Sequence, residues 1–464
     1  MLCTGVLMMV LDTTVVTVAL PSIQADLGFS GSSLVWVLNA YMLTFGGFLL
    51  LGGRLGDLFG QRKLFLLGLA VFTVASLACG LAYSQALLVV ARGVQGVAGA
   101  VVSAVALALI MNLFTEEKER VQAMGIYGFV MAAGGSLGEV LGGVMTKFLG
   151  WESVFLINLP IGVGVYWACT KLLPVDAVAN GPRKLDIGGA VTVTLGLLLA
   201  VYAVIDANNA GWTSPQTLTL LGVAALLIAA FLVIESRVER PLMPLRLFAL
   251  RNVAVANVVG VLWAAGMFAW FVISALYMQH VLGYDPLQVG LAFLPADVIM
   301  AAFSVGLSAK MVMRYGLRGP LWLGLAIAAV GLLWLARAPI AANFWIDILP
   351  SMLLLGLGAG MAFNPALLAA MNDVHPSESG LASGVVNTSF MMGGALGLAV
   401  LAAAAEARSA SLAAAGAETV VSLYGGYQLA FLLGAIITAL AALIGGLLLK
   451  PKASPPDVAA AAVH

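Results

Sequence analysis

The 464 residues are 62% hydrophobic and 9% charged, whereas a soluble globular chain carries about a quarter charged residues. So few charges cannot cover an aqueous surface. The net charge is zero, from 21 basic and 21 acidic residues, so the chain lacks the basic footprint of a nucleic-acid-binding protein. The composition excludes a soluble globular protein and a nucleic-acid-binding protein, and it indicates that the lipid bilayer is the main solvent of this chain.

Apolar runs follow one another from the first residue almost to the last. A helical span needs about 20 mostly apolar residues, so the runs predict an all-α polytopic membrane protein. The first run has no basic segment before it and contains Asp12, which favours a retained helix over a cleaved signal peptide. We count fourteen runs: Met1–Leu20, Leu34–Gly52, Leu64–Tyr83, Ala86–Leu113, Ala123–Phe148, Val154–Leu173, Leu185–Ile205, Leu218–Ile234, Val253–Val281, Val289–Val312, Leu321–Leu335, Phe344–Ala370, Leu381–Ala405 and Tyr424–Leu449.

An even number of spans places both termini on one side of the membrane. If that side is the cytoplasm, its loops and tails carry 17 of the 21 basic residues, three lie on the opposite side, and Arg92 lies within a span. Basic residues concentrate in cytoplasmic loops. We therefore expect a multi-pass protein of the plasma (cytoplasmic) membrane with both termini in the cytoplasm.

An internal repeat is visible in the sequence. Ala123-Met124-Gly125 with Gly134-Gly135-Ser136-Leu137-Gly138 matches Ala382-Ser383-Gly384 with Gly393-Gly394-Ala395-Leu396-Gly397 at an offset of 259 residues. A weaker match pairs Arg54, Gly60 and Arg62 with Lys310, Gly316 and Arg318 at an offset of 256. Parallel repeats of this kind place a substrate site between two halves near the midplane. We predict an N-terminal six-helix bundle, two inserted helices with a linker, a C-terminal six-helix bundle and a flexible cytoplasmic tail, over residues 1–174, 175–250, 251–450 and 451–464.

The loop after the second run has an unusual pattern. It reads Gly53-Arg54-Leu55-Gly56-Asp57-Leu58-Phe59-Gly60-Gln61-Arg62-Lys63. A positive-inside anchor explains its basic residues but not Asp57 between Gly53 and Gly60. We interpret Gly53, Asp57, Gly60, Arg62 and Lys63 as a gating loop whose charges contact neighbouring helix ends.

This loop resembles the signature loop between the second and third helices of the major facilitator superfamily. Three other segments resemble motifs of its fourteen-helix drug:proton antiporter branch: Leu11–Pro21, Arg92-Gly93-Val94-Gln95-Gly96 and Phe155–Gly162. The resemblance covers nearly the whole chain and implies a major facilitator fold with 6+2+6 helices in two pseudo-symmetric halves. It also implies a role for Arg92 in proton coupling.

The chain departs from that pattern at two places. Gly138-Glu139-Val140-Leu141-Gly142-Gly143 carries Glu139 where the family's fifth-helix motif has proline, so any kink must come from glycine. Trp151-Glu152-Ser153 stands where the family often has Trp-Arg-Trp. The first departure weakens the usual antiport-motif argument for this chain.

Charged residues inside spans each cost at least ~2.5 kcal/mol near the bilayer centre on insertion scales, and four of them are good candidates for function. Asp12 is expected to face the central cavity, unless it only bonds neighbouring backbone. Arg92 needs a carboxylate or a wet cavity, as a coupling residue or as a structural ion pair. Glu139 is a proton carrier or a packing residue, and one arrangement we consider pairs it with Arg92. Asp297 lies twelve residues, or about 18 Å, beyond Asp285, which places it mid-bilayer.

Polar and adaptable side chains complete a predicted substrate site. Hydrogen bonds are expected from Asn39, Tyr41, Gln95, Asn158 and Asn387, apolar contacts from Phe268, Trp270 and Met391, and charge from Asp12 and Asp297. The sequence contains no metal-ligand cluster, phosphate loop or nucleophile motif. We therefore expect that the protein binds no metal or cofactor and is not an enzyme. The proton is the expected coupling ion.

We expect a proton-coupled efflux transporter that exports lipophilic, cationic drugs or dyes by alternating access and functions as a monomer. Whether it uses a periplasmic adaptor stays open. One alternative is a dedicated exporter of a single metabolite such as an antibiotic or siderophore. A second is a non-transporting membrane sensor, although the only tail, Pro451–His464, holds no signalling domain.

Overall fold

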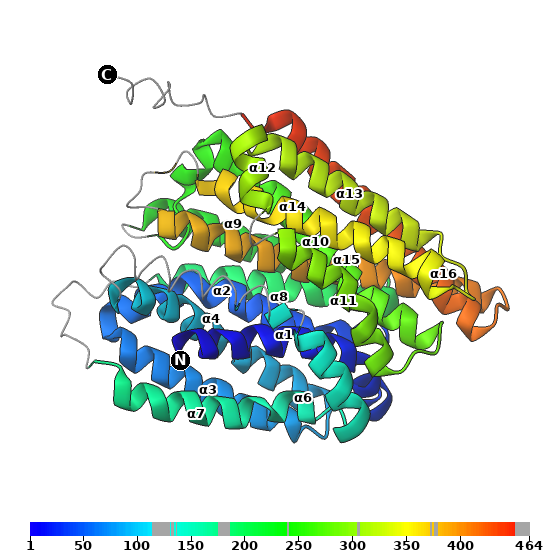
Figure 1. The fold of residues 1–464 in the computed structure, drawn as a ribbon, viewed down its shortest axis with the longest axis horizontal. Coiled ribbons are helices and arrows are strands. Elements are labelled where there is room, and N and C mark those ends of the chain that lie inside the picture. Colours follow the sequence, from blue (N-terminus) through cyan, green and yellow to red (C-terminus); the bar gives the residue numbers. More distant parts are fainter. Residues whose placement is uncertain are drawn as a thin grey trace.

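A computed structural model describes residues 1–113, 130, 134–135, 137–174, 186–238, 241–303, 307–371, 374 and 379–450. Within these ranges all regular structure is helical (Figure 1). The expected tail, residues 451–464, lies outside the described residues.

The first half consists of helices that pack on one another around α4. They are α1 (Leu2–Leu27), η1 (Ser33–Val35), α2 (Trp36–Phe59), α3 (Gln61–Gly80), α4 (Gln85–Leu113), a helix over residues 137–149, α6 (Ser153–Leu156) and α7 (Asn158–Leu172). The first predicted run ends at Leu20, but α1 continues through Pro21 to Leu27 and is capped by Gly28 at φ 70°. In a bilayer, neighbouring helices satisfy the backbone groups that a proline frees, so the chain can stay helical past it.

Two inserted helices and a second half follow. The inserted hairpin is α8 (Ile187–Ala210) and α9 (Pro215–Arg237), and the linker contains η2 (Leu245–Ala249). The second half is α10 (Arg251–His280), α11 (Pro286–Ala302), α12 (Ser308–Tyr315), α13 (Arg318–Ala336), the short turn η4 (Phe344–Ile348), α14 (Leu349–Met371), α15 (Ser379–Ala414) and α16 (Thr419–Leu448).

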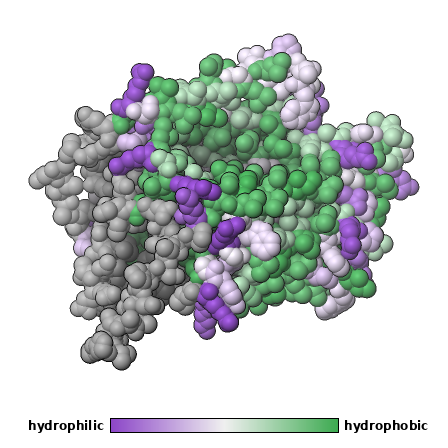
Figure 2. All heavy atoms as spheres, turned by 90° about the horizontal axis from the view of Figure 1, so that it is seen from above, coloured by the Kyte–Doolittle hydropathy of each residue, from purple (hydrophilic) through white to green (hydrophobic). Residues whose placement is uncertain are grey.

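The helices have the length and surface of membrane spans. Among the described residues, eleven helices are long and apolar enough to cross a bilayer, and Ser33–Leu49 and Pro286–Ala302 are shorter apolar helices. With the helix over residues 137–149, the described part of each predicted run is mainly helical. Apolar residues fill the middle of the visible surface in Figure 2, and hydrophilic residues gather toward its two ends. The chain is an all-α, multi-pass membrane protein.

The predicted repeat also appears in the backbone. Gly60 separates α2 from α3 at φ 98°, and Gly316 separates α12 from α13 at φ 70°. Both conformations strain any residue with a Cβ, so the two turns share the same glycine requirement. The match at an offset of 256 residues therefore marks equivalent turns in the two halves.

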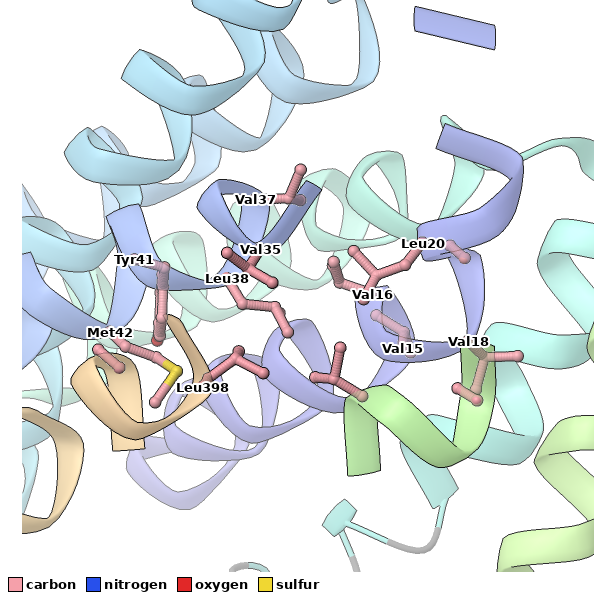
Figure 3. Packing of buried hydrophobic residues seen from close by; sticks show 14 of the residues in the cluster. Val15, Val16, Val18, Leu20, Val35, Val37, Leu38, Tyr41, Met42 and Leu398 are labelled. Carbon is pink, nitrogen blue, oxygen red and sulfur yellow. The ribbon is translucent and has the colours of Figure 1, made fainter. Parts of the chain in front are cut away.

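The start of α1 and the end of α16 lie toward the same end of the molecule (Figure 1), which we call the terminus side. The opposite end, which carries Lys147 and Asp285, is called the far side. The halves meet along α2 and α15, where Leu38, Met42 and Leu398 lie together (Figure 3). Helix α8 packs against both α2 and α15, so the inserted hairpin covers this seam.

Candidate functional site

A buried polar cluster lies inside the first half. Asp12, in the middle of α1, forms an ion pair with Arg92 of α4, and neither side chain is exposed. A charge pair with no access to water is held by its mutual attraction and by the hydrogen bonds around it. Asp12 was expected to face the central cavity, but its carboxylate points into the first half.

Amide side chains surround this pair. Gln95 Nε2 donates to Asp12 Oδ1 over 3.0 Å and to Ser76 Oγ over 2.7 Å, while its Oε1 accepts from Arg92 over 2.8 Å. Asn158 of α7 donates to the same Asp12 oxygen over 2.8 Å. Four helices, α1, α3, α4 and α7, thus meet through one network whose members are all buried.

The Arg92 guanidinium has further partners on α2. Its Nε donates to the Val37 carbonyl oxygen over 2.8 Å, and its central carbon lies 4.5 Å from the centre of the Tyr41 ring. Aromatic faces attract cations, most strongly where water is excluded. Arg92 therefore links α2 to the Asp12 cluster.

A second pair of acids joins the two halves. Glu139, on the helix over residues 137–149, and Asp297, on α11, have carboxyl groups within hydrogen-bonding reach of each other. They are 1% and 2% exposed. The pairing of Glu139 with Arg92 that the sequence left open is wrong, because Arg92 binds Asp12 and Glu139 binds Asp297. The sequence could not decide this, since both acids are far from Arg92 along the chain.

The remaining expected substrate residues are distributed over α2, α10 and α15. Asn39 is fully buried, and neither atom of its amide has a partner within the described part of the chain. Phe268 packs on Gly394 beside Met42, and Met391 packs on Gly46, so both lie at the seam between the halves. Trp270 is buried against Phe271 and Phe293. Asn387 is exposed.

The gating-loop residues flank the α2–α3 turn. Arg62 donates to the carbonyl oxygen of Thr170 over 2.6 Å, which ties the turn to the end of α7. Gly53 faces Ala104 of α4, Gly60 has φ 98°, and Lys63 is exposed. The side chain of Asp57 lies outside the described residues.

Sequence reasoning missed two members of the cluster. Ser76 accepts from both Gln95 and Asn158, and the Cys79 thiol donates to Gln95 over 3.3 Å. Cys79 was expected only to pack as a small apolar side chain. The only sequence signal was an isolated serine in an apolar run, three residues before a cysteine. Within the described ranges, no three His, Cys, Asp or Glu side chains gather in a way that could hold a metal ion.

Known proteins similar to this chain are membrane transporters. The chain is 40% identical over 408 residues to the cephamycin export protein CmcT of Amycolatopsis lactamdurans, covering 86% of this chain and 82% of that protein. It is 38% identical to the puromycin resistance protein pur8 of Streptomyces alboniger, covering 97% and 90%. It is 35% identical to the multidrug resistance protein Stp of Mycobacterium tuberculosis, covering 86% and 73%.

Solved structures share the fold at low sequence identity. An auto-inhibited peptide transporter of the POT family matches with a TM-score of 0.67 at 16% identity, covering 98% of both chains. The xylose transporter XylE from E. coli matches with a TM-score of 0.62 at 16% identity, covering 98% and 96%. Residues 2–398 match the Major Facilitator Superfamily. With its helical bundle, its repeated halves and these relatives, the chain belongs to the Major Facilitator Superfamily of membrane transporters.

Proposed function

We propose that this protein is a proton-coupled antiporter that exports lipophilic, cationic drugs or dyes across the plasma membrane by alternating access. The observation that carries the proposal is the buried Asp12–Arg92 network, in a chain whose relatives are named for export or resistance. Intramembrane acids and bases of this kind mark proton and ion pathways in transporters. The proposal also includes three further points. Both termini lie in the cytoplasm, the protein functions as a monomer, and it uses the proton as coupling ion without a cofactor.

The ion pair gives proton binding a structural consequence. A proton on Asp12 neutralises the carboxylate and leaves the Arg92 charge buried without its counter-ion. An uncompensated buried charge is costly, so the contacts among α1, α3, α4 and α7 must rearrange. Protonation of one atom thereby shifts the packing of four helices, which is the requirement for coupling a proton to a change of access.

Aromatic and thioether groups at the seam supply a surface for lipophilic substrates. Phe268 contributes to an aromatic cluster with Phe390, whose ring lies 5.9 Å away, and Phe390 also meets Trp263 at 5.6 Å. Aromatic faces bind cations as well as apolar groups, and Met391 adds a polarisable wall. Asp297 would supply negative charge for a cationic substrate when the halves separate.

Transport by purified protein in sealed liposomes tests this function. A fluorescent cationic dye is enclosed in the liposomes. An imposed pH gradient should drive movement of the dye across the membrane, and a protonophore should abolish that movement. An Asp12→Asn protein in the same liposomes is the matched control and should not respond to the gradient. Dye movement that persists with the gradient collapsed and requires ATP would contradict the proposal.

A dedicated exporter of one metabolite is the second candidate. The names of relatives favour it, because CmcT is a cephamycin export protein and another relative, 34% identical, is a tetracenomycin C resistance and export protein of Streptomyces glaucescens. A panel of chemically unrelated compounds separates the two functions. Competition by many compounds supports multidrug export, whereas competition by a single chemical class supports a dedicated exporter.

A further inference from the structure

We propose that Glu139 and Asp297 form a single proton-binding latch between the two halves, which is complete only while the far side is closed. This inference rests on the proposed proton coupling and deepens it, because it assigns the site where one proton holds one access state. Its two acids come from different halves, one from the helix over residues 137–149 and one from α11.

The geometry favours a shared proton. The two carboxyl groups lie within hydrogen-bonding reach of each other, and a carboxyl group can donate such a bond only when it is protonated. Glu139 Oε2 and Asp297 Oδ2 are buried and accept no hydrogen bond from any donor within the described part of the chain, and the pair is almost fully buried. With both groups ionised, two like charges would face each other without water, and the contact would separate.

The pair lies beside a close approach of the two halves. A methyl group at Gly290 of α11 would lie 2.5 Å from the carbonyl oxygen of Glu139. One turn along, a methyl group at Gly143 would lie 2.6 Å from the Pro286 carbonyl oxygen. Glycine alone allows this contact, so Glu139 lies at a backbone-to-backbone crossing, and Asp297 lies about two turns beyond Gly290 on α11.

Other contacts between the halves continue the closure to the surface. Lys147 and Asp285 form an ion pair of 2.9 Å at the far side, and Gln279 of α10 donates to the Val18 carbonyl oxygen of α1 over 3.0 Å. From Glu139 to Lys147 there are eight residues, or about 12 Å of helix. The acid pair is therefore the inner end of one continuous line of contact.

The latch is isolated from other charges. Of the ionisable groups that the structure describes, only Asp297 acts on Glu139, and only Glu139 acts on Asp297. Asp12 of α1, which packs against α11, is bound to Arg92, while Lys147 and Asp285 pair at the surface. Protonation of the latch is thus set by its burial and by the mutual influence of its two carboxyl groups.

This arrangement fixes how the latch responds to pH. The closed state binds a proton that the open state, with two separated carboxylates, can give up to water. Raising the pH therefore favours opening of the far side, and lowering the pH favours its closure. A proton taken up from the far side allows closure, and its release on the terminus side breaks the latch and permits opening again.

Distance measurement between spin labels tests the latch without substrate or gradient. Phe148 and Leu291 are exposed on the two crossing helices, so labelled cysteines at these positions leave the crossing intact. Cys79 and Cys169 are buried, and Cys3 is replaced by serine. In the wild-type sequence the distance between labels should lengthen as the pH rises from 5 to 9. In Glu139→Gln, the amide can donate to Asp297 at any pH, so the short distance should persist throughout.

A matched control is available in the same chain. Glu235 of α9 lies within hydrogen-bonding reach of Asp186 in a buried carboxyl pair, but that pair lies within the inserted hairpin. Glu235→Gln should keep the wild-type pH response. A wild-type distance that ignores pH, or a Glu139→Gln protein that responds like wild type, would overturn the latch. Transport in liposomes separates the two proposals. If transport is driven by the pH gradient while the label distance does not change with pH, the latch is wrong and the proposed function still holds.

Discussion

Asp12 on α1 and Arg92 on α4 neutralise each other at a place where neither side chain reaches solvent. The same Asp12 carboxylate also accepts bonds from Gln95 and Asn158. Removal of either charge leaves the other buried without its partner. The stability of the first half and the proposed proton coupling therefore depend on the same atoms.

We expect Asp12→Asn to destabilise the protein by about 3–5 kcal/mol, the usual cost of breaking a buried ion pair. Thermal unfolding in detergent measures this change. Asp12→Asn with Arg92→Gln removes both charges, so it should unfold at a higher temperature than Asp12→Asn alone. Gradient-driven transport should be absent from both variants. A single variant that is as stable as wild type would show that the pair is not held as the structure describes.

A second expectation concerns the α2–α3 turn. Asp57→Asn should lower turnover more than substrate binding, because the turn lies at the end of the helices, away from the seam. Arg62→Ala should have the same effect, since it loses the bond to the Thr170 carbonyl oxygen at the end of α7. Dye binding by equilibrium titration and transport in liposomes give the two quantities separately. Weakened dye binding with unchanged turnover per bound dye would assign the turn to the substrate site instead.

The crossing of the helix over residues 137–149 with α11 gives a third expectation. Gly290→Ala places a methyl group 2.5 Å from the Glu139 carbonyl oxygen, and overpacking of this kind costs about 1–3 kcal/mol. The spin-label distance between positions 148 and 291 should lengthen even at low pH, and transport should fall.

Gly260→Ala is the matched control for that variant. Gly260 lies within α10, and a methyl group there meets no atom within 4 Å. It should leave both the distance and the transport rate unchanged. Equal effects of the two alanines would mean that helix propensity, and not the crossing, sets the result.

Much of the fold could be predicted because the bilayer allows few solutions. A spanning chain must satisfy its backbone within each segment, so every span appears as a long apolar run that composition alone reveals. The repeat at Gly60 and Gly316 was also predictable, since both turns need a residue without a side chain. Helix ends were less predictable, as α1 shows by continuing through Pro21.

The sequence by itself determined the class of protein, the order of its helices, the resemblance to the major facilitator superfamily and the identity of the four charged residues inside the spans. Only the tertiary structure decided which of them meet. Asp12 and Arg92 are 80 residues apart along the chain, and Glu139 and Asp297 lie in different halves. Helical periodicity tells which residues share a face, but the rotation of each helix is set by packing against its neighbours, here by glycines such as Gly143 and Gly290 that admit another backbone.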